Sequence, residues 1–378
     1  MQPCPEDNRS FFEKLQNEKG LDLRDNRGKK HDLGIVLVGV VLALLSSRDG
    51  NLSSIHRHLV NHYEPLAGCL GVEKKRPVSR SQLPNILRLV SVEVFDWLLF
   101  ENYGIKLSEA EKKWFAIDGK ELRGSIETGN RRGEAIVQAV SHETLQVAAQ
   151  DYYAGEKESE VPTVRNLLEK GGLASEKITL DPLHCKPLTL EIITRAGGKY
   201  VVGLKNNQKE LKKQVLKAIE NQSCLKRISA PEKGHGRIES RIYQFYDVLE
   251  LEKDERWKNC QIKTAILVRR EREELKTGKR SVEESLYLSN GVGNYEELAQ
   301  AIRRHWTVET NNQIRDVSLQ EDKMRSEIKE LQRTMGSLRT LTTEILQKTG
   351  CQNIKAQLDN FADNFGNLIL TLKLFNFL

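Results

Sequence analysis

The sequence has few of the features that mark secreted, zinc-bound or membrane proteins. Six cysteines lie far apart without a CxxC pair, which argues against a zinc ribbon or a disulfide framework and favours a reducing compartment. The longest apolar run, residues 33–45, is too short to cross a bilayer and predicts a buried core helix. The first ten residues are polar and lack a signal-peptide pattern. We therefore expect a cytoplasmic protein that has no membrane partner.

Aromatic residues are also scarce, at 6% of the chain, whereas charged residues make up 30%. Lysine and arginine total 59 against 53 acidic residues, so the net charge is +6. This mild excess suits a polyanionic partner without requiring one. The 378 residues are enough for two or three domains with a sizeable core.

Helical spacing dominates the chain up to about residue 110. The apolar run is followed by one helix face at Leu52, Ile55, Leu59 and Tyr63, and by helical stretches at 82–90 and 92–100. These patterns predict a helical N-terminal domain over residues 32–110. The polar and basic lead-in, residues 1–31, is either solvated or contacts phosphate. The histidines at 56, 58 and 62 fit a solvated helix surface better than a zinc site with Cys69, because position 56 lies off the face that the other two share.

Strand and helix patterns alternate from residue 111 onward. Strands are predicted at 114–120, 134–141, 145–152, 177–180 and 199–205, with helices at 159–170 and 187–196. An antiparallel meander followed by right-handed crossovers predicts an α/β architecture with an RNase H-like mixed five-stranded sheet over residues 111–205. A mostly β insertion follows at 206–290, with strands at 237–249, 261–269 and 285–289. Residues 291–378 then carry a helix capped by Asn294 and further helices.

Two of the predicted strands each deliver an aspartate, Asp118 and Asp181. Asp118 alone is weak evidence, because Asp-Gly turns are common at strand ends. In a sheet of this order, however, the first and fourth strands are neighbours, so both carboxylates lie at matching positions. Glu309, on a later helix, is the natural third acid. Three such carboxylates predict two-metal chemistry with Mg²⁺, or Mn²⁺ as an alternative.

Asp316 competes with Glu309 as the third ligand. It follows Glu309 by seven residues, so the two share nearly the same helix face if the helix continues. The alternative interpretation of Asp316 is a solvated helix end.

Five ordered blocks resemble a known family: "FAIDGKELRGS", "ITLDPLHCK", "KYVVGLKNNQ", "EKGHGRIESR" and "RRHWTVETNNQIRDVSLQED". They are similar to successive blocks of DDE-type insertion-sequence transposases of the H-repeat-associated group. The segment "DNRGKKHDLGIVLVGVVLALLSSRDGNLSSI" resembles the accompanying N-terminal domain, so the resemblance covers residues 22 to about 345. The sequence departs from the family pattern at Thr310, where asparagine is usual, and at 313–314, where a His-Trp pair is usual.

The resemblance implies a metal-dependent DNA transposase with an RNase H-like core. The carried-over catalytic and metal-binding residues are Asp118, Asp181 and Glu309. The helical domain at 32–110 would bind or pair element ends. We expect a nucleoid-associated enzyme that acts on double-stranded DNA, as a homodimer when two ends are paired. The alternatives are a catalytically decayed or repurposed DNA-binding protein and a metal-dependent nuclease without strand transfer.

Several cationic or polar residues near these blocks are candidate DNA contacts. Each also has a plain structural explanation, as a surface turn, a helix start or a hairpin loop. The candidates are Lys120, Arg123, His184, Lys205, Arg237 and Arg304.

Overall fold

The computed structural model describes residues 8–46, 49–73, 76–108, 110–154, 157–220, 222–234, 236–249 and 254–378. The N-terminal part is helical, as predicted. It contains α1 (Phe11–Asn17), α2 (Leu33–Ser46), α3 (Leu52–Asn61), α4 (Tyr63–Cys69), α5 (Gln82–Leu87) and α6 (Val92–Asn102). Helix α1 lies inside the stretch that we expected to be a polar lead-in. Ser10 and Glu13 form a reciprocal capping box at its start, and Phe11 and Phe12 are buried.

The strands in the described residues overlap the predicted ones, with the exception of β6. They are β1 (Trp114–Glu121), β2 (Glu134–Ser141), β3 (Val147–Ala154), β4 (Lys177–Leu180), β5 (Lys199–Leu204), β6 (Lys226–Gly234), β7 (Arg237–Asp247), β8 (Thr264–Glu274) and β9 (Arg280–Ser289). All of them join one mixed sheet in the order β3-β2-β1-β4-β5-β9-β8-β7-β6. Among the described residues the sheet therefore has nine strands, where the sequence predicted a five-stranded core followed by a β insertion, because β9 pairs antiparallel with β5 and brings the insertion into the same sheet.

Strand β6 was not predicted from the sequence. It contains Pro231 and is otherwise rich in charge, a composition that argues against a central strand. It lies at the outer edge of the sheet, where a missing N–H costs no ladder hydrogen bond and charged side chains discourage pairing with other chains.

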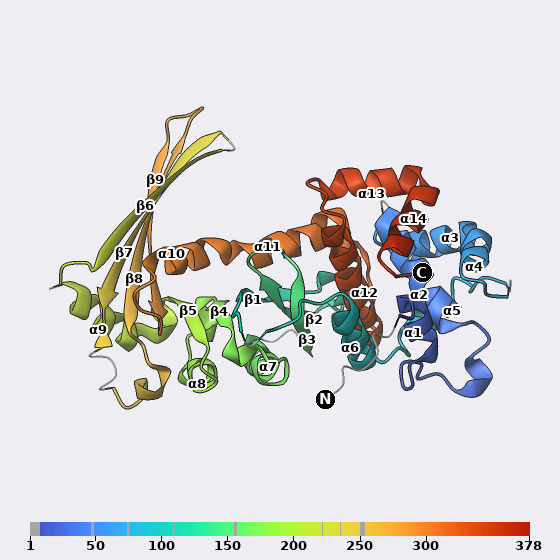
Figure 1. Cartoon of the computed structure of the whole chain (residues 1–378), viewed down its shortest axis with the longest axis horizontal. Coiled ribbons are helices and arrows are strands. Elements are labelled where there is room, and N and C mark those ends of the chain that lie inside the picture. Colours follow the sequence, from blue (N-terminus) through green and yellow to red (C-terminus); the bar gives the residue numbers. More distant parts are fainter. Residues whose placement is uncertain are drawn as a thin grey trace.

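Helices cover both faces of the sheet (Figure 1). Helices α7 (Lys157–Lys170), α8 (Pro187–Arg195) and α9 (Lys209–Glu220) lie along one face, and their apolar side chains form a core with β1–β5. Helices α10 (Tyr295–Arg304) and α11 (Trp306–Gln313) run across the opposite face. The sequence predicted one continuous helix here, starting at Asn294. Asn294 does cap α10, but the helix is interrupted at His305.

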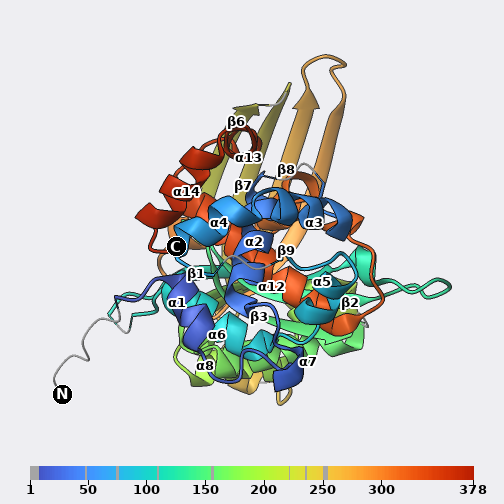
Figure 2. The same ribbon diagram turned by 90° about the vertical axis from the view of Figure 1, so that its right-hand side faces the viewer.

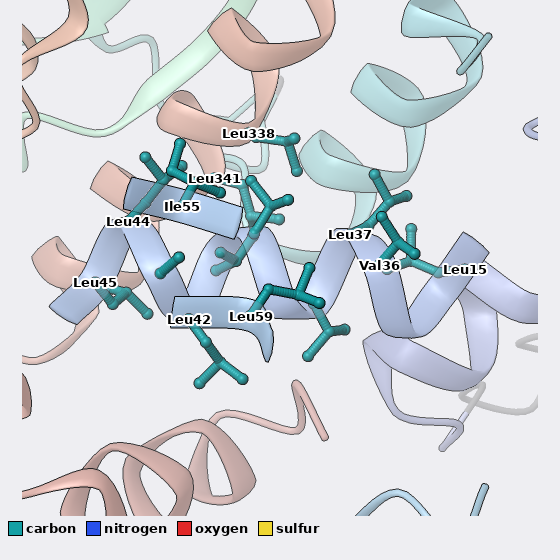
Figure 3. Close-up of a cluster of buried hydrophobic side chains, with 14 of the residues drawn as sticks. Leu15, Val36, Leu37, Leu42, Leu44, Leu45, Ile55, Leu59, Leu338 and Leu341 are labelled. Atoms are coloured by element: carbon teal, nitrogen blue, oxygen red, sulfur yellow. The ribbon is translucent and has the colours of Figure 1, made fainter. Parts of the chain in front are cut away.

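The C-terminal helices pack on the N-terminal ones. Helices α12 (Lys329–Lys348), α13 (Ile354–Asp363) and α14 (Phe365–Leu374) contribute to one hydrophobic core with α1–α6. Both groups gather at the same end of the molecule, on the right in Figure 1, and this end faces the viewer in Figure 2. Every residue of α2 is buried, and its side chains meet those of α3 and α12 (Figure 3). No described helix is both long enough and apolar enough to cross a membrane.

Candidate active site

The sheet register brings Asp118 and Asp181 to neighbouring positions. Strands β1 and β4 are parallel, and Ile117 pairs with Leu180. Asp118 is the next residue on β1, and Asp181 is the first residue after β4, where it caps a short 3₁₀ turn by accepting the N–H of Leu183 at 2.9 Å. The prediction that the first and fourth strands are neighbours is confirmed.

Side-chain alternation determines which face the aspartates share. Phe115 and Ile117 point into the core beneath α7 and α8, whereas Ala116 packs against Val308 of α11. Because side chains alternate along a strand, Asp118 lies on the side of Ala116, facing α11. Glu309 is the next residue after Val308, so the helix that carries the predicted third acid covers this face.

A polar contact fixes the junction between α10 and α11. His305 Nδ1 lies 2.9 Å from Thr179 Oγ1, and Thr179 is on β4, two residues before Asp181. Burial, together with the nearby His184, lowers the pKa of His305 to about 4, so its ring is neutral at physiological pH. The break between α10 and α11 therefore lies where His305 contacts β4, the strand that precedes Asp181.

The two aspartates lie in a poorly solvated and negatively charged environment. Burial, and next the charges of Asp181 and Glu160, raise the pKa of Asp118 to about 7. Burial also raises the pKa of Asp181, with Glu160 adding to the rise and His184 opposing it. Carboxylates that repel one another in this way favour a bound counter-cation. Burial alone raises the pKa of Glu309, which is more exposed.

Glu160 is an acid that the sequence analysis missed. It lies on α7, is buried, and accepts hydrogen bonds from Tyr153 Oη at 2.8 Å and from His184 Nε2 at 3.1 Å. The only available signal was its position four residues before Val164, which puts an acid on the apolar face of a helix. Its contact with His184 links α7 to the turn that carries Asp181.

A second group of charges ties β1 to the segment after α11. Lys120 Nζ lies 2.7 Å from Asp316 and 3.5 Å from Glu321. Glu321 also accepts two hydrogen bonds from the fully buried Arg315. Residues 314–318 form a π-helical turn, so the α-helical register that would align Asp316 with Glu309 does not continue.

Comparison with known proteins identifies the family of this chain. A family model described as "Transposase DDE domain" matches residues 109–343, more than half of the chain. The chain belongs to the DDE transposase family. The "H repeat-associated putative transposase YhhI" of Escherichia coli strain K12 is 27% identical over 314 residues, which cover 80% of this chain and 81% of that protein. The "Putative transposase YncI" of Escherichia coli O157:H7 is 26% identical over 348 residues, which cover 88% and 86%.

The family membership confirms the resemblance to H-repeat-associated transposases, and the chain is a DNA transposase. The family implies an RNase H-like fold, DNA binding, and a nuclease or nucleotidyl-transferase activity that generally uses divalent metal ions. These statements hold for the transposase as a whole and do not by themselves assign its residues.

The chemistry of the paired aspartates fits a hard divalent cation. Carboxylate oxygens are the ligands that Mg²⁺ and Mn²⁺ prefer, and Asp118 and Asp181 are held together by the strand register. Across the described ranges, however, no group of three or more His, Cys, Asp or Glu side chains is arranged to hold a metal ion. The side chain of Glu309 instead lines a groove next to Trp306.

The candidate DNA contacts of the transposase fall into three environments. Lys120 is buried among the carboxylates of its own chain, and His184 is fully buried beside Glu160. Arg123, Lys205 and Arg304 are exposed. Arg237 lines the same groove as Glu309. A DNA contact by Lys120 or His184 would first require breaking these internal contacts.

Proposed function

We propose that this transposase cuts and joins the ends of an insertion sequence by metal-dependent phosphodiester chemistry, with Asp118, Asp181 and Glu309 as its acids. The observation that carries the proposal is the parallel pairing of Ile117 with Leu180, which sets two half-buried aspartates side by side beneath the helix of Glu309. In this proposal β1–β5, with α7, α8 and α11, form the RNase H-like core.

Asp118 and Asp181 would hold divalent Mg²⁺ or Mn²⁺, with Glu309 as the third ligand from α11. The bound ions would supply activation of the attacking oxygen and charge stabilisation at the leaving oxygen. The protein's part is to keep the two aspartates desolvated and adjacent, and to place α11 over them through the His305–Thr179 contact. His184 and Glu160 act as positioning residues, because they brace the turn that holds Asp181.

The same acids would serve hydrolysis and strand joining, first with water and then with the freed 3′-hydroxyl as the nucleophile. No covalent intermediate between protein and DNA is required. The helical region at 32–110 is proposed to bind or pair element ends, and the transposase to act on chromosomal DNA as a homodimer.

The decisive experiment is a nicking and joining assay on duplex DNA that carries the ends of the chain's own element, with and without Mg²⁺. Asp118→Asn and Asp181→Asn are compared with the wild type and with Asp363→Asn, a control at the exposed end of α13. We expect nicking and joining by the wild type and the control, and neither by the two site variants.

Equal nicking by the wild type and the site variants would reject these acids. Nicking without joining would favour the nuclease alternative. DNA binding without any nicking would favour a decayed transposase.

A further inference from the structure

An arginine-lined groove runs between the insertion and the helices that cover the sheet. It encloses about 850 Å³ between strands β6–β9 and helices α10 and α11. Arg237 and Arg241 project into it from β7, Arg270 and Arg272 from β8, and Arg303 from α10. Glu309 and Trp306 line the same groove, so it reaches the helix of the proposed third acid.

The strand arginines are arranged by one buried carboxylate. Glu239 is only 4% exposed and pairs with Arg241 on its own strand. It also accepts hydrogen bonds at 3.0 Å from Arg270 Nη2 and from Arg272 Nε, while Arg237 lies 3.8 Å away. Four guanidinium groups therefore share one carboxylate, which fixes their positions without neutralising them all.

Cationic side chains slightly outnumber carboxylates in the groove. Six cationic side chains line it, the five arginines and Lys233, against four carboxylates, those of Glu232, Glu239, Glu283 and Glu309. Successive same-face residues on a strand lie about 7 Å apart, but the guanidinium groups of Arg270 and Arg272 converge on the same oxygen, Oε2 of Glu239. Guanidinium groups that line the groove from both the strands and α10 suit a polyanion that contacts several of them better than one phosphate ion.

We propose that this groove binds the sugar-phosphate backbone of the DNA strand that is cut, with Arg272 and Arg303 as phosphate contacts, and leads that strand to Glu309. The inference rests on the proposed function, because the ligand is the transposase's own DNA substrate. It adds a role for the insertion, which holds one wall of the substrate channel while α10 and α11 form the other.

The test measures DNA binding without cleavage. Fluorescence anisotropy in EDTA follows binding of a labelled duplex that carries an element end, over a series of salt concentrations. Arg272→Gln and Arg303→Gln are compared with Arg269→Gln. Arg269 is a matched control, because it lies on the same strand as Arg272 but points to the opposite face, where it pairs with Glu271.

Each groove variant is expected to weaken binding about five- to tenfold and to lower the slope of log K against log salt by about 1. Arg269→Gln is expected to bind like the wild type. Arg272→Lys, which keeps the charge, is expected to keep the wild-type salt slope. Thermal melting verifies that each variant is folded, which matters for Arg303→Gln because Arg303 pairs with Glu232 of β6 at 3.0 Å.

Wild-type affinity and slope in both groove variants would overturn the groove assignment while leaving the proposed function intact. A wild-type protein that binds neither this duplex nor any other would reject the proposed function itself. If Arg269→Gln lost as much DNA affinity as the two groove variants, the assignment would also be overturned, because the loss would reflect only the change in net charge.

Discussion

The ammonium group of Lys120 lies 2.7 Å from the carboxylate of Asp316. Lys120 comes two residues after Asp118 on β1, and Asp316 lies in the π-helical turn that follows α11. The pair therefore ties the strand of the first aspartate to the helix of the proposed third acid. Because Lys120 is buried and also lies near Glu321, its charge compensates carboxylates that would otherwise repel one another.

Replacing Lys120 is expected to destabilise the protein. Lys120→Met leaves Asp316 and the buried Glu321 with less compensation, so we expect the free energy of unfolding to fall by about 2 kcal/mol. Arg123→Gln is the control, because Arg123 is exposed and lies 4.0 Å from Asp322, and we expect a change within about 0.5 kcal/mol. Urea unfolding measures both. Equal stability of the two variants would show that the ion pair between Lys120 and Asp316 does not stabilise the folded protein.

Glu309 and Asp316 are expected to separate into a catalytic and a structural role. Glu309→Gln should abolish nicking while the melting temperature and DNA affinity stay unchanged, since its carboxylate is exposed in the groove. Asp316→Asn should lower the melting temperature and retain nicking, because Asp316 is engaged by Lys120. Nicking by Glu309→Gln together with none by a folded Asp316→Asn would reverse the assignment of the third ligand.

Much of the strand pattern could be predicted from the sequence because it depends on local signals. The bounds of β2 and β4 were predicted to the residue, where apolar runs meet clear stop signals. The adjacency of Asp118 and Asp181 followed from the order of strands and helices, because right-handed crossovers leave few alternative topologies.

The features that were missed depend on contacts between distant parts of the chain. The apolar spacing continues through His305, so the break between α10 and α11 is visible only with its contact to Thr179. The π-helical turn, which separates Asp316 from Glu309, likewise has no local signature. Glu160 gave only a weak signal, since an acid at the start of a helix is usually a favourable first-turn residue.

Gly124 is expected to tolerate no side chain. A Cβ atom at this position would lie 2.0 Å from the carbonyl oxygen of Met324, and the Gly124 carbonyl accepts the N–H of Ser326 at 2.9 Å. Gly124→Ala should therefore lower the free energy of unfolding by about 2–3 kcal/mol. Gly68→Ala is the control, because a Cβ atom there meets nothing within 4 Å. If the Gly124→Ala protein were as stable as the wild type, the segments around Gly124 and Met324 would be able to move apart at little cost.

Glu344 is expected to make stability depend on pH in the neutral range. It is fully buried on α12 and accepts the N–H of Val147 at 2.7 Å. Burial raises its pKa to about 8, although Val147, Gln146 and Lys348 oppose the rise. The folded state therefore keeps a proton that the unfolded chain releases above its ordinary pKa of 4.5. This contribution to stability is complete below that value and is lost as pH rises toward 8.

Glu344→Gln should remove this dependence, because the amide cannot ionise. Relative to the variant, the wild type should lose up to about 1.4 kcal/mol of unfolding free energy per pH unit between about pH 5 and 8. Urea unfolding at several pH values measures the difference between the two proteins. Glu330→Gln, at the exposed start of the same helix, is the control, and its free energy of unfolding should change with pH in the same way as that of the wild type. A constant difference between wild type and Glu344→Gln across this range would mean that Glu344 is ionised in the folded protein, with its charge compensated by Lys348.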